Sequence, residues 1–302
     1  METTLPHSLN SPDDRKARLP VTWWGILIRV VVGVSVLLIA NFIRVPVHQF
    51  SAARLPADES AQLLADSLIF LITPIIVIAV VSLWFRRVER IPLAVTGLLD
   101  LRRILPGILG GMLLIALATA LGWAGLALLG QQLQNPPDEL GGTGLGASTG
   151  ALLFFMFVRA YLLQGLPEEL LYRGWFFSLT RSRPWLTFWW TTLAFTVIHV
   201  TSAGGQQSVL DHLYYLALPL GMGLLAGAVV LWRGSMWWAV GTHGGMHVCL
   251  PVASIMVPMT AGPLQWLVLG LTQALVAGGV LLLWRLGRDG GQPPVRSMWE
   301  RA

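Results

Sequence analysis

Gly165-Leu166-Pro167-Glu168-Glu169-Leu170-Leu171-Tyr172-Arg173-Gly174 places two adjacent carboxylates and a guanidinium in a run of sequence that is otherwise apolar enough to lie in lipid. Ionisable groups at such a depth are costly, so each of them marks a candidate functional site and requires a partner. We therefore expect the fold to be organised around this stretch, with other apolar segments supplying partners for the three charges.

The composition is that of a polytopic membrane protein. Of the 302 residues, 55% are hydrophobic and only 12% are charged, whereas about a quarter of a soluble domain is charged. The polar first 20 residues lack the layout of a cleaved signal peptide, so the first apolar run is expected to stay as a membrane anchor. A single cysteine, Cys249, excludes an internal disulfide.

Apolar runs of roughly 17 to 25 residues predict eight transmembrane helices. They cover about residues 22–44, 64–85, 104–130, 150–180, 185–201, 213–232, 235–258 and 264–285. The predicted fold class is all-α, a polytopic membrane protein of eight transmembrane helices with an internal polar cavity. Its expected parts are a cytoplasmic N-terminal tail 1–21, membrane helices one to three 22–148, a core of helices four to seven 149–260, a last membrane helix 261–288, and a cytoplasmic tail 289–302.

Basic residues alternate along the chain as the positive-inside rule requires. Fifteen of the 20 Lys and Arg residues fall in the N-terminus, every second loop and the C-terminus, whereas the intervening loops hold only Arg44 and Arg54. This bias predicts a multi-pass protein of the cell membrane with both termini in the cytoplasm. The net charge of +5 therefore follows the membrane and is not a nucleic-acid footprint. Arg29, Arg159 and Arg173 lie within spans, and Arg29 is expected to snorkel to the interface.

Histidines on two other predicted helices lie at the depth of the glutamates. At ~1.5 Å per helical residue, Glu168 lies roughly 20 Å from the cytoplasmic edge, His199 about 21 Å, His247 about 18 Å and His243 about 12 Å. Three separate segments thus deliver polar groups to one layer of a ~30 Å hydrocarbon slab. This agreement in depth favours a single shared site.

Helix geometry divides the two glutamates. Glu169 and Arg173 are four residues apart, share a helix face and can form an ion pair. Glu168 lies about 100° away and is left to face the histidines. Pro167 suits the first turn of a restarted helix. We interpret Glu169 and Arg173 as structural support and Glu168 as chemically active, and the alternative is a wholly structural cluster in which Glu168 is only hydrogen-bonded.

These residue types suit hydrolysis by an activated water. A carboxylate in a low-dielectric cavity can act as a general base, so Glu168 would activate a water for attack on a peptide carbonyl while His199 holds the same water. His243 or His247 would stabilise the oxyanion by hydrogen bonding. No Ser or Cys has a histidine at a persuasive spacing, which makes a covalent mechanism less expected. Small residues beside these histidines either serve packing or leave room for a peptide: Gly241, Gly244 and Gly245.

Three motifs in successive predicted spans carry a family resemblance. Glu-Glu-x-x-x-Arg at 168–173, Phe-x-x-x-His at 195–199 and His-x-x-x-(polar) at 243–247 resemble the CPBP intramembrane proteases, which include the CAAX prenyl endopeptidases of the Rce1 type. The resemblance covers about residues 150–260 and implies a glutamate-dependent, membrane-embedded endopeptidase with eight helices. It also implies roles: Glu168 corresponds to the water-activating glutamate, His199 to its partner, and His243 with the residue four later to the oxyanion-stabilising pair.

The last of these positions departs from the family pattern. The family usually has Asn where this chain has His247, and an imidazole can also donate a hydrogen bond, with a different pH dependence. The substitution leaves two alternatives for the cofactor: none, or zinc held by Glu168, His199, His243 and His247. The usual His-Glu-x-x-His zinc motif is absent, since Gly244 occupies the position of its Glu. A metal-free mechanism is the preferred hypothesis.

The expected partners are membrane lipid and a peptide or membrane-protein substrate, without nucleic acid. Neither the identity or prenylation of the substrate nor the oligomeric state follows from the sequence. Two other function classes stay open. One is a non-proteolytic membrane scaffold or bacteriocin-immunity-type protein of the same family. The other is a transporter, because buried ionisable groups also suit proton relays.

Overall fold

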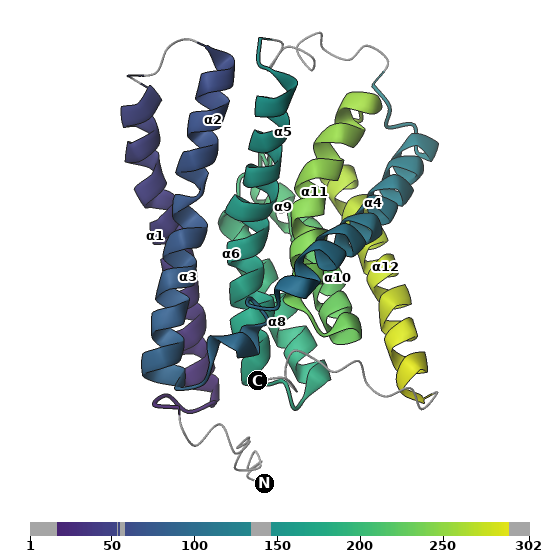
Figure 1. The fold of residues 1–302 in the computed structure, drawn as a ribbon. Coiled ribbons are helices and arrows are strands. Elements are labelled where there is room, and N and C mark those ends of the chain that lie inside the picture. Colours follow the sequence, from purple (N-terminus) through teal and green to yellow (C-terminus); the bar gives the residue numbers. More distant parts are fainter. Residues whose placement is uncertain (1–16, 53, 55–57, 134–145, 290–302) are drawn as a thin grey trace.

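A computed structural model describes residues 17–52, 54, 58–133 and 146–289 of the protein. Within these residues the structure is helical, with no strand and one isolated bridge between Gln132 and Met259, which confirms the all-α class. The helices form one bundle, in which α1 begins and α12 ends at the same end (Figure 1). Of the predicted tails 1–21 and 289–302, residues 1–16 and 290–302 lie outside the described residues.

The N-terminal part of the bundle is a helical hairpin followed by a separate helix. α1 (Trp23–Ala52) lies against α2 (Glu59–Phe70) and α3 (Ile72–Trp84), which follow each other almost without interruption. Short π- and 3-10-helical turns then lead to α4 (Ile104–Leu128), which crosses the bundle obliquely (Figure 1).

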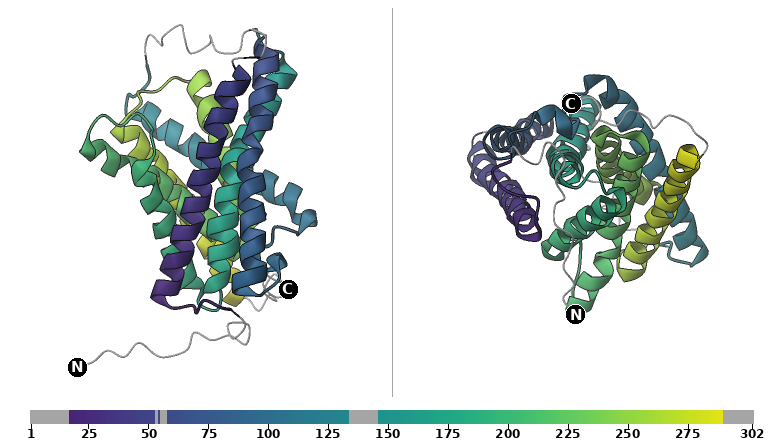
Figure 2. Two further views of the ribbon diagram at one scale, coloured as in Figure 1. Left: turned by 90° about the vertical axis from the view of Figure 1, so that its left-hand side faces the viewer. Right: turned by 90° about the horizontal axis from the view of Figure 1, so that it is seen from below.

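The stretch that carries the two glutamates forms a composite helix in the middle of the bundle. It consists of α5 (Thr149–Phe157), a π-helical segment Val158–Gly165, α6 (Leu166–Glu169), a second π-helical segment Leu170–Phe176, and α7 (Phe177–Leu179). The remaining helices are α8 (Pro184–Ile198), α9 (Val209–Tyr215), α10 (Ala217–Arg233), α11 (Met236–Met256) and α12 (Pro263–Asp289). Seen end-on, the composite helix lies between the α1–α3 hairpin and the later helices (Figure 2).

Six helical stretches among the described residues are long and apolar enough to cross a membrane. They are Trp23–Ser51, Glu59–Glu89, Leu93–Leu128, Thr149–Leu179, Val209–Arg233 and Pro263–Gly287. The predicted count of eight spans is therefore not confirmed, nor is the internal polar cavity. α8 has only 15 residues, and α11 falls short in composition because its first half is buried in protein, where His243 and several glycines replace apolar side chains.

Glycines hold α4 and α11 in close contact. A Cβ added at Gly107 would lie 2.7 Å from the backbone of Trp237, and one at Gly111 would lie 2.3 Å from the carbonyl oxygen of Trp238. On the facing helix, a Cβ at Gly241 would lie 2.4 Å from the carbonyl oxygen of Gly107. Such distances allow only glycine, so this small-residue spacing serves helix packing.

The glycines beside the histidines also serve packing. A Cβ at Gly244 would lie 2.3 Å from the ring of Tyr161, and one at Gly245 would lie 2.7 Å from the side chain of Ile115. The sequence left open whether these glycines serve packing or leave room for a peptide. They serve packing, because protein atoms already fill the space that a peptide would need. Gly227 of α10 is packed as closely, because a Cβ added there would lie 2.9 Å from the ring of Phe188.

We expect Gly241→Ala to destabilise the protein by about 1–3 kcal/mol, because the added methyl meets backbone atoms of α4 that cannot move independently. Gly278→Ala in α12 is the matched control, since nothing lies within 4 Å of its Cβ, and this variant should gain about 1 kcal/mol from helix propensity. Thermal unfolding in detergent measures both. Equal midpoints for the two variants would contradict the close contact of α4 and α11.

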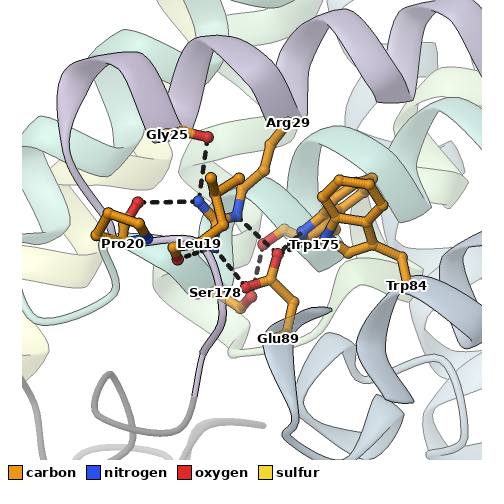
Figure 3. Close-up of polar contacts among 8 residues, drawn as sticks. All are labelled: Leu19, Pro20, Gly25, Arg29, Trp84, Glu89, Trp175 and Ser178. Atoms are coloured by element: carbon orange, nitrogen blue, oxygen red, sulfur yellow. Dashed lines mark hydrogen bonds and ion pairs between the residues drawn. The ribbon is translucent and has the colours of Figure 1, made fainter. Parts of the chain in front are cut away.

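Arg29 does not snorkel, contrary to the expectation from the sequence. Its side chain is 0% exposed, and its Nε and Nη2 each lie 2.6 Å from an oxygen of Glu89. Backbone carbonyls complete the set of acceptors: Leu19 at 2.7 Å, Gly25 at 3.0 Å and Pro20 at 3.2 Å (Figure 3). The guanidinium stays inside because the segment before α1 folds over it and supplies the acceptors that water would otherwise provide.

The same carboxylate connects the hairpin to the composite helix. Glu89 Oε1 accepts hydrogen bonds from Trp84 Nε1 at 2.7 Å and from Trp175 Nε1 at 3.1 Å (Figure 3). Trp175 belongs to the second π-helical segment, shortly after the two glutamates. The buried Arg29–Glu89 pair therefore fixes the rotation of the composite helix relative to α1 and α3.

Candidate active site

Glu168 and Glu169 lie on a single α-helical turn between two π-helical segments. α6 spans only Leu166–Glu169, and Pro167 occupies its first turn. Proline has no N–H to donate, and the wider π winding before it lets the helix continue without a break. The predicted restart at Pro167 is therefore a change of winding within one continuous helix. π-helical turns are rare, and they occur frequently at functional sites.

Glu169 is the centre of a fully buried network. Its Oε2 lies 3.3 Å from Arg173 Nε, and its Oε1 accepts a hydrogen bond from His243 Nδ1 at 2.9 Å. Arg173 in turn donates from Nη2 to the carbonyl oxygen of Gly223 at 2.9 Å, and its guanidinium lies 4.7 Å from the ring centre of Phe195. Glu169 and Arg173 thus join the composite helix to α8, α10 and α11.

The bond between Glu169 and His243 differs from the expected arrangement, in which both histidines of α11 face Glu168. His243 instead directs Nδ1 at Glu169, the carboxylate that we expected to pair only with Arg173. The α-helical angle of about 100° between successive residues applies only within α6, and π winding on both sides changes which neighbours each carboxylate can reach.

Glu168 faces His199. Glu168 Oε2 lies 4.0 Å from His199 Nε2, and the two side chains are 12% and 15% exposed. Oε2 is buried and has no hydrogen-bond partner among the described residues. On the far side of its ring, His199 holds Nδ1 at 2.8 Å from the carbonyl oxygen of Phe195. Because a carbonyl can only accept, Nδ1 carries a hydrogen, and in the neutral ring Nε2 is an acceptor.

Two acceptors therefore face each other at a separation that suits one bridging water. A water that donates a hydrogen bond of about 2.8 Å to each of two atoms 4.0 Å apart has an angle of about 90° between the bonds, near the angle between its own O–H groups. Such a water has both hydrogens held and its lone pairs directed away from the pair. This is the orientation that a nucleophile needs.

The remaining histidine, His247, completes the cluster. Its ring stacks on that of His243, with centroids 5.4 Å apart and an interplanar angle of 28°. In the part of the chain that the structure describes, His247 has no hydrogen-bond partner, so its ring N–H is available to another group. The structure thus brings Glu168 and His199 together on one side, and Glu169, His243 and His247 on the other.

Phe195 connects the two halves, and we assigned it no role from the sequence. Its carbonyl oxygen orients His199, and its ring lies 4.5 Å from that of His199 and 5.8 Å from that of His243. The ring of Tyr172 packs against the same ring in a T-shaped arrangement, with centroids 5.2 Å apart. A signal was present, because Phe195 precedes His199 by four residues, the spacing at which a helical carbonyl meets a side chain one turn later.

The four predicted zinc ligands do not form one group. Within the described residues, which include all four predicted ligands, no group of three or more His, Cys, Asp or Glu side chains is placed to hold a metal ion. Because His243 Nδ1 is bound to Glu169, only Nε2 of that ring is left to contact another group.

Fold and site together define a polytopic helical membrane protein with a buried acid–imidazole centre. Residues 150–249, about a third of the chain, match the family model described as "Type II CAAX prenyl endopeptidase Rce1-like". This match confirms the resemblance to the CPBP group of CAAX-type proteases that the three motifs predicted. The segment contains both glutamates, Arg173 and all three histidines of the site. No curated protein and no solved structure matches the chain.

Proposed function

We propose that the protein is an intramembrane endopeptidase that hydrolyses peptide bonds of membrane-associated proteins. The observation that supports this most directly is the buried, unpartnered Oε2 of Glu168, 4.0 Å from an imidazole nitrogen that is itself an acceptor. The Rce1-like match points to the same class of enzyme.

In the proposed reaction, Glu168 acts as general base and His199 positions the water. Glu168 takes one proton as the water oxygen attacks the peptide carbonyl carbon, and the same proton then passes to the leaving amine as the peptide bond breaks. The tetrahedral oxyanion accepts a hydrogen bond from His243 or His247. His247 is the better placed donor of the two, because Glu169 already engages one nitrogen of His243.

Glu169 and Arg173 serve as structural support. Their network is fully buried and fixes both the ring of His243 and the helix that carries Glu168. Neither residue needs to contact the substrate for this role.

We also propose that eight helices span the cell membrane and that both termini lie in the cytoplasm. If α8 and α11 also cross, Arg181 and Arg233 fall on the same side of the membrane as Arg86 and Arg87, which satisfies the positive-inside rule. α11 carries His243 and His247 and is buried over its first half, so it needs fewer apolar side chains than a lipid-facing span, whereas α8 is short but exposes apolar side chains on one face.

The substrates can be identified by comparing carboxy-terminal peptides from cells that express the wild-type protein with those from cells that express Glu168→Gln. We expect a defined set of membrane proteins to carry new carboxy termini, created by cleavage, in wild-type cells but not in cells with the variant. A cellular phenotype that is unchanged in both Glu168→Gln and His199→Ala, with identical sets of termini, would instead support the scaffold or immunity-type function.

Chelators should leave hydrolysis unchanged, because Glu168 and His199 suffice to activate the water. The measurement is cleavage of a reporter peptide by purified protein before and after treatment with 1,10-phenanthroline, with thermolysin as the positive control for zinc removal. Loss of activity that returns on addition of zinc would show that a metal participates, and would exclude the metal-free mechanism.

A further inference from the structure

Two arginines that play no part in the proposed reaction approach each other on neighbouring helices. Arg44 lies on α1, and Arg159 lies in the first π-helical segment, close enough for the two charges to repel. Phe70 of α2 lies between their helices. The guanidinium of Arg44 is 4.9 Å from its ring centre, and the same ring packs on Phe155 at 5.5 Å and clusters with Val158, the neighbour of Arg159.

Protein groups neutralise this pair only in part. The Nε of Arg44 is buried without a hydrogen-bond partner, and Arg159 is exposed and has no hydrogen bond or ion pair with any residue that the structure describes. Asp66 attracts the charge of Arg44, but no ion pair joins the two side chains among the described residues, and one oxygen of Asp66 is bound to His48 at 2.7 Å. By contrast, the buried Arg29 has both oxygens of Glu89 and three backbone carbonyls.

Both arginines lie at one boundary of the membrane. Counted from Trp23, where α1 begins, Arg44 is ~32 Å along the helix, and counted back from Leu179, Arg159 is ~30 Å along the composite helix. The hydrocarbon core is ~30 Å thick, so both guanidiniums reach the level at which lipid phosphates lie, on the face opposite the start of α1. Apolar side chains nearby are open to lipid: Phe42 is 71% exposed and Leu153 61%.

We propose that the phosphate of a membrane lipid binds between Arg44 and Arg159 and bridges α1 to the composite helix. The planar fork of arginine suits phosphate oxygens, and one phosphate can accept hydrogen bonds from both guanidiniums. The bound anion removes the repulsion between them, while its acyl chains lie along the exposed apolar surface. Neither arginine takes part in the proposed hydrolysis. The charge of Arg159 also reaches His247, so the occupied site would alter the electrostatic surroundings of the active-site cluster.

Lipid binding can be measured on the purified full-length protein after delipidation in a maltoside detergent. The probes are phosphatidylglycerol, a diacylglycerol with the same acyl chains, and soluble glycerol 3-phosphate. Phosphatidylglycerol should raise the unfolding temperature with saturable dependence, and the other two should not. A rise of equal size with diacylglycerol, or saturation by glycerol 3-phosphate at the same concentration, would overturn the proposal of a lipid phosphate.

Charge-removing variants test the bridge itself. Arg44→Gln and Arg159→Gln should each weaken phosphatidylglycerol binding about tenfold, and the double variant little more, because both lose the same phosphate. Arg54→Gln is the matched control, since Arg54 already lies over Phe50 at 3.6 Å and donates to its carbonyl oxygen. Without lipid, Arg159→Gln should be at least as stable as the wild type, because a repulsive contact is removed.

Three results would contradict this site. They are unchanged binding in both single variants, strictly additive losses in the double variant, and displacement of the lipid by a peptide with a free C-terminal carboxylate but not by its amide. The last result would assign the two arginines to a peptide instead of a lipid. Because every measurement concerns binding, the outcome does not depend on whether the protein is a protease.

Discussion

Glu168→Gln should reduce peptide hydrolysis by about 10²–10⁴-fold, the range that general-base catalysis contributes. The amide keeps the size of the carboxylate but cannot accept the proton of the water, and its NH₂ group would face His199 Nε2 across the 4.0 Å gap. That contact is more favourable than the present one between two acceptors, so the variant should fold as well as the wild type. The measurement is cleavage of a reporter peptide by purified protein, with thermal unfolding recorded on the same samples.

The matched control is Glu59→Gln, the same chemical change on an exposed glutamate at the start of α2. This variant should retain wild-type activity. His199→Ala should also lose activity, with a smaller deficit than Glu168→Gln, because it removes an acceptor for the water but leaves the base in place. Full hydrolysis by folded Glu168→Gln would remove Glu168 from the mechanism and with it the assignment of a glutamate-dependent protease.

Arg29→Met should destabilise the protein by about 3–5 kcal/mol, because the change leaves the buried carboxylate of Glu89 without its cation. The Trp84 and Trp175 N–H groups would still donate to it, but they carry no compensating charge (Figure 3). Thermal or denaturant unfolding in detergent measures the loss. Arg54→Met provides a control at an exposed arginine and should change stability by less than about 1 kcal/mol.

A double variant distinguishes loss of the ion pair from loss of packing. Arg29→Met combined with Glu89→Gln removes both charges, so its cost should be smaller than the sum of the two single changes. If Arg29→Met alone proved as stable as the wild type, the guanidinium would be solvated in the membrane interface, as the sequence suggested, instead of buried.

The helical architecture could largely be predicted from the sequence, because apolar length and helix periodicity are local properties. The order of helical stretches agrees with the predicted spans, and the pairing of Glu169 with Arg173 follows from the four-residue spacing alone. The number of spans was harder to predict. A helix surrounded by protein, such as α11, does not need the composition of a lipid-facing helix, and a single chain does not reveal which helices surround it.

Long-range partners could not be predicted. Arg29 finds Glu89 sixty positions later, and nothing in the first span indicates that the segment before it folds back to cover the guanidinium. His243 finds Glu169 instead of Glu168 because the winding of the helix changes on both sides of α6, and no propensity rule forecasts π-helical turns. The role of Phe195 depends on a backbone carbonyl, which every residue has and which sequence patterns therefore do not distinguish.

The two π-helical segments make the direction of the carboxylates sensitive to chain length. Each residue added to or removed from a helix turns everything beyond it by about 100°, so a one-residue deletion within Val158–Gly165 would rotate Glu168 away from α8 while leaving the helix intact. Substitutions can be tolerated at many positions of this segment, but insertions and deletions cannot. We therefore expect the number of residues between Arg159 and Glu168 to vary less among active relatives than the identity of those residues.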